Sequence, residues 1–135
     1  MIKQPLLFKD YQEGLAKGEL LGVFCDKCHN FSFHTSVYCN HCGSTGLSAK
    51  PYDTTGVIRT FTVIRVAAEG RNAPFIVALV LGNSGIHMMG NLEGIDPDSA
   101  SMGLIGKKVK ISGKKTLPDR FSPKVEQCLV FSLED

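Results

Sequence analysis

Residues 25–42 read CDKCHNFSFHTSVYCNHC, and this stretch decides the fold. It holds two Cys-x-x-Cys pairs with ten residues between them. Each pair is typical of a tight turn that directs two thiolates at one tetrahedral metal ion, most often zinc. A segment this short cannot bury a core of its own, whereas a structural zinc ion contributes about 10–16 kcal/mol of apparent binding energy to folding. The pattern therefore predicts a zinc ribbon whose ligands are Cys25, Cys28, Cys39 and Cys42.

Disulfides and an iron site are the alternatives to zinc. Paired Cys-x-x-Cys spacing without a secretion signal favours thiolates in a reducing compartment, so we expect a cytoplasmic location. A rubredoxin-like iron site has the same four ligands and stays open, although it leaves the rest of the chain unexplained. His29, His34 and His41 lie close by in sequence, and with four cysteines available we interpret them as surface or supporting residues.

The composition excludes some classes of protein. Hydrophobic residues make up 43% and charged residues 21% of the 135 residues, as in an ordinary globular chain. No apolar run is long enough to cross a membrane, and the N-terminus does not resemble a secretion signal. The formal net charge of +2 treats the cysteines as neutral. Four thiolates and one Zn²⁺ add −4 + 2, which brings the charge close to zero and weakens the case for nucleic-acid binding.

The pattern divides the chain into three expected domains: an N-terminal helical segment over 1–18, the zinc ribbon over 19–50 and a barrel over 51–135. A short helix is predicted within residues 5–17, where apolar residues recur near a 3.6-residue period. These residues are Leu7, Phe8, Tyr11 and Leu15. Because so short a helix is marginal in water, its apolar stripe needs a surface on this chain or on a partner.

The expected fold is mainly β, with the short helix and a rubredoxin-like zinc ribbon followed by a five-stranded OB-fold barrel. In the ribbon region, strands are predicted over 19–24 and 30–38, and residues 47–55 are predicted as a connector. The barrel strands are predicted over 57–66, 75–81, 86–92, 107–112 and 124–133, with a hairpin turn at 82–85. A helical or turn segment near 96–103 separates the third and fourth of these strands.

No catalytic group stands out in the sequence. Ser84 lies in a Gly-Asn-Ser-Gly turn and lacks the Gly-x-Ser-x-Gly context of a nucleophile. His87 is expected on a strand surface, and nothing beside Cys128 would activate its thiol. Four cysteines would also close the metal site to water and substrate. The chain itself is therefore predicted to be non-catalytic.

The order of these parts resembles a family of zinc-ribbon, OB-fold proteins that accompany acyl-CoA enzymes such as thiolases, hydroxymethylglutaryl-CoA synthases and enoyl-CoA hydratases. The motifs that carry the resemblance are CDKC at 25–28, CNHCGS at 39–44, GVIRTFTVIR at 56–65, PFIVALVL at 74–81 and LPDRFSP at 117–123. Two positions depart from the family: Phe24 stands where a basic residue is frequent, and Ser-Phe-His-Thr at 32–35 replaces a Pro-Pro-Arg run.

The resemblance implies a non-catalytic subunit that binds the coenzyme A part of a substrate and docks on a thiolase-like catalytic subunit. The candidate cations for the phosphates of coenzyme A are Arg59, Arg65, Arg71, Lys114, Lys115 and Arg120. The candidate docking residues are the helical stripe of Leu7, Phe8, Tyr11 and Leu15. A competing hypothesis is single-stranded nucleic-acid binding, in which Phe61 or Phe75 would stack on bases. The near-zero charge of the metal-loaded chain weighs against it.

Overall fold

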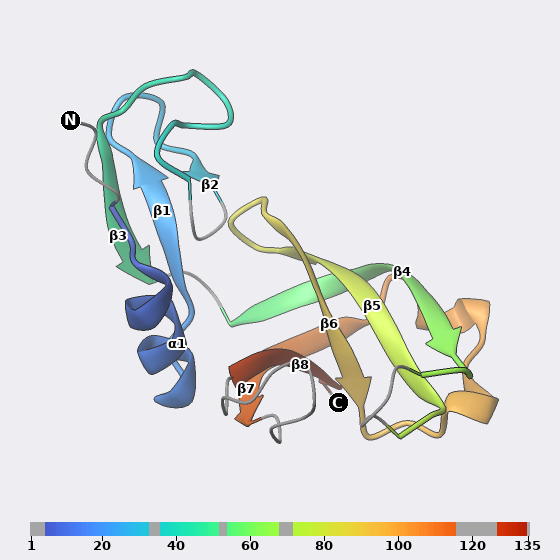
Figure 1. Cartoon of the computed structure of the whole chain (residues 1–135). Coiled ribbons are helices and arrows are strands. Elements are labelled where there is room, and N and C mark those ends of the chain that lie inside the picture. The colour runs from blue at the N-terminus through green and yellow to red at the C-terminus, as the bar shows by residue number, and fades with distance from the viewer. Residues whose placement is uncertain (1–4, 33–35, 52–53, 68–71, 116–126, 135) are drawn as a thin grey trace.

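The computed structural model describes residues 5–32, 36–51, 54–67, 72–115 and 127–134 (Figure 1). Its elements are α1 (Phe8–Ala16), β1 (Leu21–Cys25), β2 (Phe31–Ser32), β3 (Leu47–Pro51), β4 (Thr55–Ile64), β5 (Phe75–Gly82), β6 (His87–Glu93), the 3₁₀ helices η1 (Pro97–Ser99) and η2 (Met102–Leu104), β7 (Lys108–Lys115) and β8 (Gln127–Leu133). Within these residues, no helix is both long and apolar enough to cross a membrane.

The predicted N-terminal helix is present as α1 and is shorter than the predicted range. Leu7 is extended, with φ −81° and ψ 146°, so the helix begins at Phe8. At the other end Gly18 adopts φ 80°, a left-handed conformation that glycine adopts without a steric penalty. Its N–H donates to the carbonyl oxygen of Leu15 at 3.1 Å, which completes the helix terminus.

The ribbon is a three-stranded antiparallel sheet in the order β2-β1-β3. The strand predicted over 19–24 is confirmed as β1. The strand predicted over 30–38 is too long, because only β2 is a strand, 36–38 are irregular and 33–35 lie outside the described residues. The connector predicted over 47–55 is wrong over most of its length, since β3 pairs with β1 along all five residues. Pairing with a central strand overrides the weak strand propensity of Ser-Ala-Lys-Pro.

The five remaining strands form a closed barrel in the order β4-β5-β6-β8-β7. The β6–β8 pairing is parallel and the other four are antiparallel, which is the Greek-key pattern expected of an OB fold. The predicted hairpin joins β5 to β6, and the predicted short helical segment appears as η1 and η2. The mainly β prediction, with an N-terminal helix and a five-stranded barrel, is confirmed.

Glycines allow two of the barrel strands to approach each other closely. A Cβ atom placed on Gly90 in β6 would lie 2.6 Å from the carbonyl oxygen of Leu129 in β8. Gly56 in β4 is similarly confined, with Val80 Cγ1 at 2.5 Å from such an atom. Real Cβ atoms do not approach other atoms this closely. The pairing of β6 with β8 that closes the barrel therefore requires a residue without a Cβ atom, a glycine, at position 90.

Helix α1 packs against β1 of the ribbon and against β7 and β8 of the barrel. Leu15 contacts Gly113 so closely that a Cβ there would lie 2.6 Å from Leu15 Cγ. The Gln12 side chain pairs with the backbone of Gln127, donating to its carbonyl oxygen at 3.0 Å and accepting from its N–H. One apolar cluster therefore contains side chains from the helix, the ribbon and the barrel.

We predict that Gly90→Ala destabilises the protein by about 2 kcal/mol, because overpacking against fixed backbone typically costs 1–3 kcal/mol. Urea unfolding followed by circular dichroism measures this free energy. Gly103→Ala is the matched control, since its added Cβ would meet only Ser101 Oγ at 3.5 Å. Equal stability of the two variants would contradict the role of Gly90 in barrel closure.

Candidate metal centre

The two Cys-x-x-Cys pairs form two copies of one turn, at 25–30 and 39–44. In each, the residue after the second cysteine donates its N–H to the carbonyl oxygen of the first, at 2.9 Å and 3.0 Å. The first cysteine in turn donates its N–H to the carbonyl oxygen five residues later, at 2.9 Å and 2.8 Å. His29 and Gly43 occupy equivalent left-handed positions, with φ of 61° and 75°. The repeated turn places both thiols of each pair on one side.

The structure brings together the four cysteines that the spacing singled out. All four Sγ atoms lie within 4.8 Å of one another. Across the pairs, Cys25 Sγ lies 3.6 Å from Cys42 Sγ, and Cys28 Sγ lies 3.5 Å from Cys39 Sγ. Metal–sulfur bonds of about 2.3 Å in a tetrahedron require sulfur–sulfur separations of about 3.8 Å. The donor set therefore fits a tetrahedral metal ion such as zinc.

Backbone N–H groups favour the thiolate forms that a metal needs. The pKa of Cys25 is lowered chiefly by the backbone N–H of Cys28, which lies 3.5 Å from the sulfur. The pKa of Cys39 is lowered to about 6, first by the backbone of Cys42 and then by that of His41, against the opposing effect of burial. The His41 N–H lies 3.3 Å from Cys39 Sγ. Hydrogen bonds to the charged form explain both shifts.

The histidines near the cysteines do not join the cluster within the described residues. His29 and His41 are exposed, and His34 lies outside the described part of the chain. The His29 ring instead lies 5.9 Å from the ring of Phe24. Lys50 Nζ sits 4.2 Å from the centre of the same Phe24 ring, at a favourable cation–π distance. This chain thus has an aromatic residue, Phe24, at the position where a basic residue is frequent in the family that it resembles. The ammonium group of Lys50 lies over the Phe24 ring.

The candidate coenzyme A cations are dispersed where the structure describes them. Arg59 is exposed at the bulge of β4, where the register with β5 shifts between residues 58 and 60. Arg65 Nη1 lies 2.7 Å from Asp98 Oδ1, so its charge already has an exposed partner. Lys114 and Lys115 belong to the end of β7, but the positions of their side chains are not described. Arg71 and Arg120 lie outside the described residues.

The stripe predicted for partner docking is divided by the structure. Leu7 and Phe8 are 52% and 48% exposed, whereas Tyr11 and Leu15 are buried in the core of this chain. Burial also raises the pKa of Tyr11 to about 12. The helix covers its own barrel and ribbon with these two side chains, so they are unavailable to a partner. Leu7 and Phe8 stay candidates.

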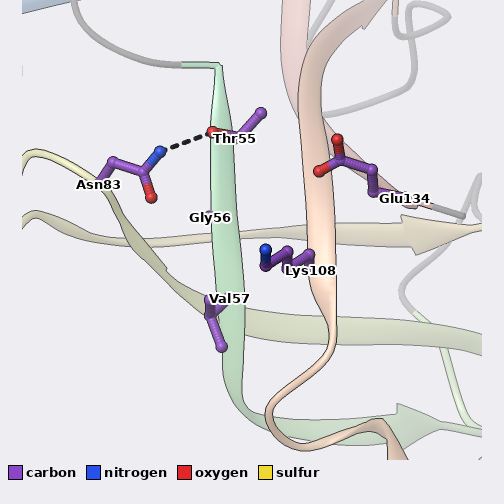
Figure 2. A pocket seen from close by; sticks show the side chains of 6 residues that line it. All are labelled: Thr55, Gly56, Val57, Asn83, Lys108 and Glu134. Carbon is purple, nitrogen blue, oxygen red and sulfur yellow. Dashed lines mark hydrogen bonds between the residues drawn. The ribbon is translucent and has the colours of Figure 1, made fainter.

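A pocket of about 250 Å³ that was not predicted from the sequence lies beside β4 (Figure 2). Its lining residues are Thr55, Gly56, Val57, Asn83, Lys108 and Glu134. Asn83 Nδ2 donates to Thr55 Oγ1 at 2.8 Å, and Lys108 and Glu134 bring opposite charges to the same hollow. The lining comes from four separate segments, and only the turn containing Asn83 had a sequence signal. Ligand pockets usually have about 300–1,000 Å³, so this one is small for a drug-sized molecule.

A β ribbon with a cluster of four cysteines, joined to an OB-fold barrel, defines the class of protein. Residues 49–114 match the family model of the ChsH2 C-terminal OB-fold domain. This match and the cysteine cluster support the resemblance to zinc-ribbon, OB-fold proteins that the sequence motifs indicated.

Solved structures share the whole fold. A chain of the Ltp2–ChsH2(DUF35) aldolase matches with a TM-score of 0.70 and 24% identity, over 91% of this chain and 91% of that chain. A protein of unknown function from the DUF35 family of Sulfolobus solfataricus matches with a TM-score of 0.60 and 20% identity, over 93% of this chain and 84% of that chain. No curated protein matches. At these identities the likeness establishes the fold alone.

We predict that Cys39→Ser abolishes stoichiometric metal binding and leaves the ribbon sensitive to protease, because a buried ligand and its share of the binding energy are lost. Metal analysis of the purified variant and limited proteolysis measure the two effects. Cys128→Ser is the matched control and should keep its metal, since Cys128 lies in β8 outside the cluster. Full metal content in Cys39→Ser would refute the four-cysteine site.

Proposed function

We propose that this chain is a non-catalytic, coenzyme A-binding and scaffolding subunit of an acyl-CoA-processing complex, most simply with a thiolase-type catalytic subunit. The observation that carries the proposal is the end-to-end match to a chain from a two-component aldolase, Ltp2–ChsH2(DUF35). An aldolase partner is consistent with the same role. The family resemblance in the sequence supplies the acyl-CoA substrate class.

The metal in this proposal is zinc with a structural role. Four thiolates fill a tetrahedral site, which leaves no position for a water molecule or a substrate carbonyl. The ion would hold the two Cys-x-x-Cys turns of the ribbon together. Iron is the alternative occupant, and a ferric tetrathiolate would be coloured whereas a zinc site is colourless.

The proposal supports a division of labour between the two subunits. A chain that positions a substrate contributes to catalysis without supplying a reacting group, because orientation is a large part of an enzymatic barrier. Coenzyme A carries phosphates at one end and a thin arm at the other. Basic side chains on the barrel would hold the phosphates while the arm leads to the partner.

We predict that the catalytic subunit co-purifies with this chain from its native host and is a thiolase-like or aldolase-like acyl-CoA enzyme. The isolated chain should show no turnover of acyl-CoA, and the complex should. Tagged capture with peptide mass spectrometry, followed by activity assays on the separated and recombined subunits, tests both statements. Recovery of single-stranded DNA or RNA in place of an enzyme would refute the proposal in favour of nucleic-acid binding.

Within that complex, Arg59→Ala should weaken coenzyme A binding about tenfold, the equivalent of one charge-assisted contact. Arg65→Ala should have a smaller effect because Asp98 already compensates its charge. Isothermal titration of the assembled complex with coenzyme A measures both constants. Unchanged affinity in Arg59→Ala would remove that residue from the phosphate site.

A further inference from the structure

The outer face of the sheet formed by β4, β5 and β6 is unusually apolar. In β5, residues alternate between fully and partly buried, and the partly buried set is Phe75, Val77, Leu79 and Leu81. Their register partners in β4 include Val57 and Ile64. None of these six belongs to the core cluster or to the partly buried side chains packed against it. They therefore lie on the side of the sheet that faces away from the core, which we call the outer face.

Met89 extends the outer face onto β6, where it pairs with Leu79 and is 65% exposed. Among the other residues of this face, Thr60, Thr62, His87 and Asn91 carry no permanent charge. Arg59 at the bulge of β4 and Glu93 at the end of β6 are exposed and charged. Helix α1 packs on β1, β7 and β8, on a different part of the molecule (Figure 1). An apolar central strand with a partly buried phenylalanine, beside an exposed methionine and with polar and charged residues around it, has the composition of the centre of a protein interface.

Two basic side chains border the outer face along β7. On the β7 side, Lys108 pairs with Val57 and Lys110 with Thr55, and both lysines are exposed. Neither lysine makes an ion pair within the described residues, although Glu134 shares the pocket of Figure 2 with Lys108. Lys110 therefore offers the less compensated charge. A complementary surface would have an apolar centre and a carboxylate along the edge that meets β7.

The size of the outer face distinguishes between partners. Three strands about 4.8 Å apart, over a shared span of about seven residues at about 3.3 Å per residue, cover on the order of 300 Å². A stable interface buries about 800 Å² on each partner. A symmetric dimer that used this face alone would fall well short of that area. The face has the right size for the apolar centre of a larger interface whose rim includes Lys110.

We infer that the outer face of β4, β5 and β6 is the surface on which the catalytic subunit docks. The catalytic subunit would contribute an apolar ridge flanked by carboxylates. This inference rests on the proposed function, since it names the surface through which that role is carried out. Tyr11 and Leu15 are buried within the chain, so the helix retains only Leu7 and Phe8 for docking. The outer face offers a broader and more continuous apolar area.

Met89→Glu tests the inference with the smallest risk to folding, because the side chain is mostly exposed. The purified catalytic subunit identified by co-purification is the probe, and its dissociation constant is measured by biolayer interferometry. Met89→Glu should weaken binding at least tenfold, as expected when a charge enters the apolar centre of an interface. Met102→Glu is the matched control, since Met102 is 75% exposed on η2, and it should bind within twofold of the unchanged chain.

Two further variants separate the outcomes. Lys110→Glu should weaken binding and reduce its dependence on salt, as expected for the basic edge. Phe8→Glu should bind as the unchanged chain does.

Normal binding by Met89→Glu, with loss of binding in Phe8→Glu, would overturn the inference and return docking to α1 while preserving the proposed function. A shift from dimer to monomer in Met89→Glu without loss of enzyme binding would also overturn it, in favour of self-association. If the unchanged chain retains no acyl-CoA enzyme, the proposed function fails and this inference with it.

Discussion

The convergence of four cysteine sulfurs is the constraint on which the ribbon depends. Apart from the metal ligands, the ribbon sheet contributes few side chains to the core, and β2 has only two residues. The two copies of the Cys-x-x-Cys turn satisfy their own backbone hydrogen bonds and direct the thiols to one point. A metal ion bound there supplies the free energy that a hydrophobic core supplies elsewhere. Because β1 ends at Cys25, the position of the four sulfurs also determines the position of β1. The surface formed by Phe24 and Lys50 is positioned with it.

Helix α1 connects this metal-organised part to the part organised by packing. Leu15 fits against Gly113 of β7, while Gly14 leaves room for Leu21 of β1, with a Cβ at position 14 only 3.1 Å from Leu21 Cδ1. The helix is too short to be stable by itself, so its stability comes from these two contacts and from the pairing of Gln12 with Gln127. A ribbon and a barrel that would otherwise share only a linker thus share one core.

The sequence predicted those features whose signals are local. Paired cysteines predicted the cluster, a Gly-Asn-Ser-Gly turn predicted the β5–β6 hairpin, and alternating apolar residues predicted the barrel strands. Features set by distant contacts were missed. β3 has a poor strand sequence and exists because β1 needs a partner on that edge. The pocket of Figure 2 joins Thr55, Asn83, Lys108 and Glu134, whose proximity follows from barrel closure.

The strand β5 is apolar on both of its faces. It pairs with β4 on one side and β6 on the other, but every strand of a closed barrel has two neighbours, so its position alone does not explain the pattern. The core needs Ile76, Ala78 and Val80, which are buried, and makes no use of the alternate set. Helix α1 shows the opposite case. Its Tyr11 and Leu15 are buried in the core, and only Leu7 and Phe8 stay exposed. A side chain already buried in its own chain contributes nothing to association, whereas an apolar one left uncovered costs free energy in water until something covers it. The surplus of apolar residues therefore lies on β5 of the sheet and not on the helix.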